Sequence, residues 1–135
     1  MGIDGSDPSL RALAKAIYEA QLHGRDLHIL HAIDLSPALL HLPDDVTVDT
    51  RDMANEQRTV AWESAQLLLE DAGLEVVRVD REGSPGKALI AYCAEIDAEL
   101  LVISTRGLGR VKKLLLGSTA QDVVRNGTCD LLLVR

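Results

Sequence analysis

The sequence has 135 residues, of which 47% are hydrophobic, and a formal net charge of −7 at pH 7. These values predict one globular domain over residues 1–135 that buries ~70% of its unfolded surface, and the acidic balance argues against a nucleic-acid partner. No stretch approaches the ~18 apolar residues of a membrane helix, so we expect no membrane partner. Cys93 and Cys129 fit neither a disulfide framework nor a metal cluster, which favours a cytoplasmic location.

The first third of the chain is predicted to form strand, helix and strand. Met1 to Ile3 should be the end of a short strand. Ser6 or Asp7 caps the following helix, which Gly24 ends. Leu27 to Ile33 is the second strand.

Two histidines, His28 and His31, lie in this second strand. A spacing of three in a strand places them on opposite faces of the sheet. Because neither has an acidic or cysteine partner at ligand spacing, we expect no metal site here.

The middle of the chain is predicted to form a long loop, a helix, a strand and a second helix. Leu35 to Asp49 contains two prolines and no sustained period, and both a lid over a ligand and a segment packed on the sheet remain open. The helix should run from Thr50 to Ala72. Charges within Glu75 to Val79 indicate a strand at a sheet edge. Gly83-Ser84-Pro85 then starts a helix with Cys93 on its buried face.

The last third of the chain combines a strand, a glycine loop and a helix start. Leu100 to Ile103 reads as a strand buried on both faces. A loop from Ser104 to Gly109 and a turn at Gly117-Ser118-Thr119 lead into a helix that ends near Arg125, before a last strand at Leu131 to Val134. Glycines allow positive φ and close approach, and free N–H groups at a helix N-terminus point at the ligand, so this order suits an anion site.

Positive charge is concentrated in the same stretch. It contains Arg106, Arg110, Lys112 and Lys113, and no acidic residue falls between Arg106 and Gly117. A basic island beside a glycine loop in an acidic protein suggests phosphate rather than nucleic acid. A solvated basic surface turn is the alternative, and on spacing alone both stay open.

Strands alternate with helices five times. This alternation predicts the α/β class, as a single-domain, Rossmann-like, five-stranded parallel sheet flanked by helices. In such sheets a ligand binds at the carboxyl ends of the strands, where the winding reverses.

The spacing of nine residues between Gly107 and Gly117-Ser118 resembles the second part of a known signature. That signature, G-x-x-G-x9-G-[S/T], is typical of ATP-binding universal stress proteins. Gly2 to Ala16, Leu27 to Asp34 and the final CDLLLVR are similar to other segments of that family. The resemblance implies the strand order 3-2-1-4-5, with the winding reversed between the first and fourth strands. The first glycine of the signature is Ser104 here.

The resemblance also implies the roles of the site residues. Backbone N–H groups of Gly117, Ser118 and Thr119 would hold phosphate oxygens, and Gly107 would let the loop approach them. Asp4 would contact the nucleoside, with a turn-stabilising role as the alternative. Ala32 or Ile33 would contact the base, and Ile103 would wall the pocket. The full set of expected binding residues is Asp4, Ala32, Ile33, Ile103, Ser104, Gly107, Gly109, Gly117, Ser118 and Thr119.

The function implied is that of a universal stress protein that binds ATP or a related adenine nucleotide and acts as a regulatory homodimer in the stress response. The two copies would pair through the C-terminal strand. A nucleotide-free interaction module on the same fold is the alternative. The sequence lacks G-x-x-x-x-G-K-[S/T] and G-x-S-x-G, so we expect no catalytic residue and no enzyme, although slow ATP hydrolysis stays open. Any Mg²⁺ would be held mainly by phosphates and water.

Overall fold

The computed structural model describes residues 1–36, 49–107 and 116–135. The strands are β1 (Gly2–Ile3), β2 (Leu27–Ile33), β3 (Val76–Glu82), β4 (Leu100–Ser104) and β5 (Asp130–Val134). The helices are α1 (Asp7–His23), α3 (Thr50–Glu70), α4 (Pro85–Glu95) and α5 (Ser118–Asn126). Strands and helices alternate along the chain and all strand pairs are parallel, which confirms the predicted α/β class.

The helix boundaries follow local chemistry. Ser6 caps α1, since its side chain accepts a hydrogen bond from the backbone N–H of Ser9, and Gly24 ends the helix in the left-handed conformation with φ 59°. The helix predicted to reach Ala72 ends earlier, with Asp71 as its C-cap. Most of the predicted loop from Leu35 to Asp49 lies outside the described residues. Both interpretations of it, as a lid over a ligand and as a segment packed on the sheet, therefore stay predictions.

The sheet has two parts, with strand order β1-β2-β3 in one and β4-β5 in the other. This order agrees with 3-2-1-4-5 and the predicted Rossmann-like class holds, although β1 and β4 share no hydrogen-bond ladder in the described residues. β1 has two residues, and N–H and C=O groups alternate sides along a strand. It therefore has few groups left for a second neighbour after pairing with β2. The two strands still meet, since a Cβ on Gly2 would lie 3.6 Å from Ile103 Cγ2.

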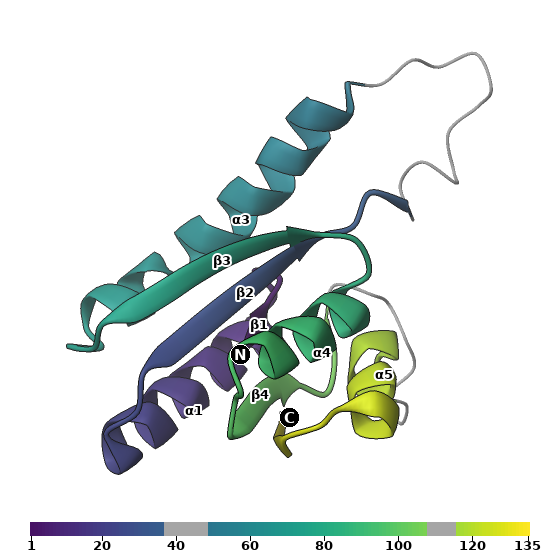
Figure 1. The fold of residues 1–135 in the computed structure, drawn as a ribbon. Coiled ribbons are helices and arrows are strands. Elements are labelled where there is room, and N and C mark those ends of the chain that lie inside the picture. The colour runs from purple at the N-terminus through teal and green to yellow at the C-terminus, as the bar shows by residue number, and fades with distance from the viewer. Residues whose placement is uncertain (37–48, 108–115) are drawn as a thin grey trace.

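Helices cover both faces of the sheet, with α1 and α3 on one face and α4 and α5 on the other (Figure 1). β3 forms the edge next to β2 and continues beyond the predicted Val79 to Glu82, because it pairs with β2 along its whole length. The core on the α1 and α3 side includes Leu13, Ile29 and Val102. The carboxyl ends of β1, β2 and β4 lie together at one edge, where the loops that follow them meet.

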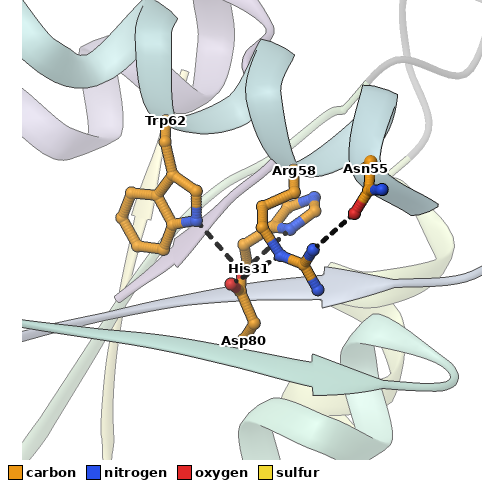
Figure 2. A network of polar contacts seen from close by, with 5 residues as sticks. All are labelled: His31, Asn55, Arg58, Trp62 and Asp80. Atoms are coloured by element: carbon orange, nitrogen blue, oxygen red, sulfur yellow. Dashed lines mark hydrogen bonds and ion pairs between the residues drawn. The ribbon is translucent and has the colours of Figure 1, made fainter. Parts of the chain in front are cut away.

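The alternation of side chains along β2 separates its two histidines, as predicted. His28 Nδ1 lies 2.8 Å from the hydroxyl oxygen of Tyr92 on α4. His31 lies beside Asp80 and close to α3 (Figure 2). Cys93 is buried as predicted, and burial raises the pKa of its thiol to about 11. Within the described ranges, none of the helices is long and apolar enough to cross a membrane.

Candidate functional site

A cavity of about 210 Å³, here called the narrow cavity, opens where β1 and β4 end. Most of the residues predicted for the site line it. These are Asp4, Ala32, Ile103, Ser104, Gly107, Gly117, Ser118 and Thr119. Ile33 is buried and does not line this cavity, because it follows Ala32 in β2 and successive strand residues face opposite sides. Gly109 lies outside the described residues.

The N-terminus of α5 forms one wall of the narrow cavity. Its N-cap is Gly117, which provides no side-chain cap, and the first intrahelical bond runs from the N–H of Gln121 to the Gly117 carbonyl. The first N–H groups of a helix have no intrahelical partner, which leaves those of Ser118, Thr119 and Ala120 to interact with a ligand. Gly117 itself donates its N–H to the Thr105 carbonyl at 2.9 Å. In this conformation the Gly117 N–H is therefore engaged within the loop.

The two signature glycines serve different purposes. Neither has a positive φ, so the expectation that they supply this conformation is wrong. Gly117 has φ −61°, and a Cβ there would stand 3.6 Å from the Thr105 carbonyl oxygen, an ordinary contact. At Gly107, in contrast, a Cβ would overlap Asp4 Oδ2. At Gly107 the constraint is the space next to the Asp4 side chain and not the backbone conformation.

Asp4 connects the end of β1 to both α1 and the glycine loop. Its Oδ1 accepts hydrogen bonds from the Ser6 backbone N–H at 3.0 Å and the Ser6 hydroxyl at 2.6 Å. This is the turn-stabilising arrangement that was the alternative for Asp4. Its Oδ2 faces Gly107 at the wall of the narrow cavity. One oxygen of this carboxylate therefore stabilises the turn, and the other lies against Gly107.

Ser104 stands where the signature has its first glycine. Its hydroxyl donates a hydrogen bond to the carbonyl of Arg106, two residues on. The Ser104 side chain thus forms a hydrogen bond within the loop. Arg106 is exposed. The remaining cations of the predicted basic island, Arg110, Lys112 and Lys113, lie outside the described residues.

A second cavity of about 570 Å³, here called the wide cavity, adjoins the first. The two share Asp4, Ala32, Pro85, Ser118 and Thr119, and together we call them the cleft. The other wall of the wide cavity comes from α3, through Met53, Glu56, Gln57 and Val60. Sequence reasoning did not predict this wall, since nothing local in α3 indicates where the helix lies.

Five polar side chains beside this wall form the Asp80 cluster: His31, Asn55, Arg58, Trp62 and Asp80 (Figure 2). Of these, His31 also lines the wide cavity. Asp80 Oδ2 accepts from Arg58 Nε at 2.9 Å and Oδ1 accepts from Trp62 Nε1 at 3.0 Å. Arg58 also donates to Asn55 Oδ1 at 2.9 Å. The cluster joins β2, β3 and α3 and was not predicted.

His31 is the buried member of the cluster, with 4% of its surface exposed. Its Nδ1 lies 3.3 Å from Asp80 Oδ1, but it makes no hydrogen bond in the described part of the chain. Burial lowers the pKa of the imidazole, while Asp80 partly opposes that shift. His31 is therefore neutral at pH 7.

The sequence and the fold both have known relatives. The model of the universal stress protein family matches residues 1–135. The chain belongs to the universal stress protein family. A universal stress protein of Thermus aquaticus, encoded in the QAH/OAS sulfhydrylase 3' region, is 36% identical over all of this chain and 96% of its own length.

Two solved members of the family share the fold. The universal stress protein UspA from Lactobacillus plantarum has a TM-score of 0.79 and is 19% identical, over 99% of this chain and 94% of that one. A universal stress protein solved in complex with cAMP has a TM-score of 0.73 and is 28% identical, over 100% of this chain and 94% of that one.

Proposed function

We propose that residues 1–135 form one domain that binds ATP or a related adenine nucleotide in the cleft. The observation that carries this proposal is the uncapped N-terminus of α5, which opens onto a cavity also lined by Gly107 and Asp4. The N–H groups of Ser118 to Ala120 would hold phosphate oxygens. The nucleoside would lie toward Asp4, Ala32 and Ile103. The relative that was solved with cAMP supports an adenine nucleotide as the ligand class.

We propose binding without designed catalysis. Burial keeps the thiol of Cys93 protonated, and this thiol lies away from the cleft. In the described ranges, no group of three or more His, Cys, Asp and Glu side chains is placed to hold a metal ion. Mg²⁺ that arrives with ATP would then be held mainly by the phosphates and water.

Two measurements test this function. The protein is purified without added nucleotide and denatured, and the released small molecules are separated by chromatography. Stripped protein is then titrated with ATP and with GTP in a calorimeter. We expect adenine nucleotide in the released fraction and saturable binding that favours ATP. An empty released fraction together with no heat of binding would contradict the proposal.

A nucleotide-free interaction module is the second candidate. The observation that favours it is that the loop satisfies some of its own polar groups: Ser104 donates to Arg106 and Gly117 donates to Thr105. In this conformation neither the Ser104 hydroxyl nor the Gly117 N–H is therefore available to a phosphate. The titration above separates the two candidates.

We also propose that the protein acts as a regulatory homodimer in the cytoplasmic stress response. β5 pairs with β4 on one side and ends the described sheet on the other. Its residues Leu131 to Val134 are only half-buried in the single chain, and an apolar edge strand is an aggregation risk unless it is covered. Leu132→Lys should convert the dimer into monomer or insoluble protein. An unchanged dimer by light scattering would refute pairing through β5.

A further inference from the structure

α3 is attached unevenly to the rest of the molecule. Its fully buried side chains, Ala61, Ala65 and Leu69, all lie beyond its midpoint. Residues 50–60 contain no buried side chain, yet they supply one wall of the wide cavity. Within residues 50–60, no buried apolar side chain therefore anchors the part of α3 that faces the cleft.

The Asp80 cluster provides an attachment at this point. Arg58 and Trp62 are one helical turn apart on α3, and each donates to a different oxygen of Asp80 (Figure 2). Hydrogen bonds to a charged partner are shorter and roughly twice as strong as those between neutral groups. The bond from Arg58 to Asn55 extends this polar contact one further turn toward the N-terminus of α3.

The position of His31 leaves Asp80 available to α3. In the register of β2 and β3, His31 is directly opposite Asp80. The charged groups that influence the imidazole are Asp80 from β3, Arg58 from α3 and Asp4 from the turn after β1. Because burial keeps His31 neutral at pH 7, it does not compete as a second cation for the carboxylate that binds Arg58.

We propose that Asp80 is a positioning residue for the α3 wall of the wide cavity, which would flank a nucleoside bound near Asp4 and Ala32. It holds the N-terminal half of α3 through Arg58 and Trp62, so that Met53, Gln57 and Val60 stand across the wide cavity from Ala32. Asp80 lines neither cavity and acts through the helix. This inference rests on the proposed function and assigns to it a residue outside the signature.

The test compares two ligands on matched variants. ATP would contact the whole cleft. Tripolyphosphate has only the phosphate chain, which the N-terminus of α5 would bind. Asp80→Asn keeps the size of the side chain and removes its charge. We expect it to weaken ATP binding about five- to tenfold, the low end of usual couplings between sites. Tripolyphosphate affinity should stay within about twofold of the wild type. A purely structural defect would lower the melting temperature without changing the ratio of the two affinities.

Two further variants complete the test. Arg58→Gln removes the cation of α3 that pairs with Asp80, at a half-exposed position. It should weaken ATP binding and leave tripolyphosphate binding unchanged, as Asp80→Asn does. This variant therefore tests the proposal if Asp80→Asn does not fold. Glu95→Gln breaks the 2.9 Å ion pair between Glu95 and Arg81 of β3, away from the Asp80 cluster. Glu95→Gln should bind both ligands as the wild type does.

Trp62 is the single tryptophan of the chain, so its fluorescence reports directly on the cluster. ATP should change its emission in the wild type, and Asp80→Asn should need about five- to tenfold more ATP to reach half of its change. Equal ATP affinity in Asp80→Asn and the wild type, or an equal loss of both ligands, would overturn this inference alone. A wild-type protein that binds neither ligand would overturn the proposed function and this inference with it.

Discussion

The two ends of the cleft are built from different groups. At the proposed phosphate end, the groups that we expect to bind the ligand are backbone N–H donors at the start of α5, next to a glycine that leaves room for Asp4. At the other end, the wall is a set of side chains on α3, and we propose that Asp80 of β3 holds that helix. An added side chain at Gly107 should therefore weaken binding at the α5 end, whereas the loss of the charge of Asp80 should weaken binding at the α3 wall.

The largest effect should come from filling the space at Gly107. In Gly107→Val, the new Cβ would overlap Asp4 Oδ2 and its methyl groups would enter the narrow cavity. We expect ATP affinity to fall at least ~100-fold, equivalent to about 2.7 kcal/mol. Gly117→Ala is the matched control, since its Cβ makes only ordinary contacts and its φ suits any residue. Calorimetric titration that finds less than a tenfold loss for Gly107→Val would rule out close approach at this glycine.

Removing the carboxylate of Asp4 should have the next largest effect. Asp4→Ala should weaken ATP binding by about 1.5–3 kcal/mol, the range for a hydrogen bond to a charged group. It should also lower the stability by about 1 kcal/mol, because Ser6 loses two hydrogen bonds. Asp4→Asn keeps an acceptor for Ser6 and separates the two roles. If Asp4→Asn binds ATP as the wild type does, the carboxylate serves only the turn.

A smaller gain is expected from restoring the signature glycine. Ser104→Gly removes the bond between the Ser104 hydroxyl and the Arg106 carbonyl and gives the loop more freedom. ATP affinity should then rise by up to ~1 kcal/mol, on the scale of the conformational effects of glycine. The measurement is equilibrium titration with a fluorescent ATP analogue. Conversion of a non-binding protein into a binding one would instead support the nucleotide-free module.

The smallest effect is the contribution of His31 to the pH dependence of folding stability. Burial lowers the pKa of His31 in the folded protein below its unfolded value of about 6.5. The unfolded chain therefore binds more protons between these two pKa values, and His31 lowers the stability as pH falls below about 6.5. Urea unfolding at pH 7.5, 6.0 and 5.0 should show a smaller loss of stability on acidification for His31→Asn than for the wild type. Parallel losses would show that His31 titrates normally.

The order of elements and the phosphate end were predictable because their signals are local. Ser6 and Gly24 lie at the ends of α1 as the sequence indicates, and the residues around Gly107 and Gly117 meet at the cavity. The use of each glycine was not predictable, since it depends on contacts with Thr105 and Asp4 that no spacing encodes.

The α3 end was not predictable for a different reason. In the sequence, Asp80 is one of several charges and directly follows the edge strand predicted over Glu75 to Val79. The role of Asp80 depends on the strand register that places it opposite His31. It also depends on the packing of α3, which brings Trp62 within hydrogen-bond distance of Asp80. The interruption between β1 and β4 likewise follows from how few groups a two-residue strand can offer.

The most direct test of the central claim, that different groups hold the two ends of the ligand, is an amide NMR titration with three ligands. Tripolyphosphate should shift the signals of Ser118, Thr119 and Ala120 and leave α3 unchanged. Adenosine should shift those of Gln57 and Val60, and ATP should shift both sets. An ATP titration that leaves the amides of Ser118 to Ala120 unmoved, or a tripolyphosphate titration that moves α3 equally, would contradict the account.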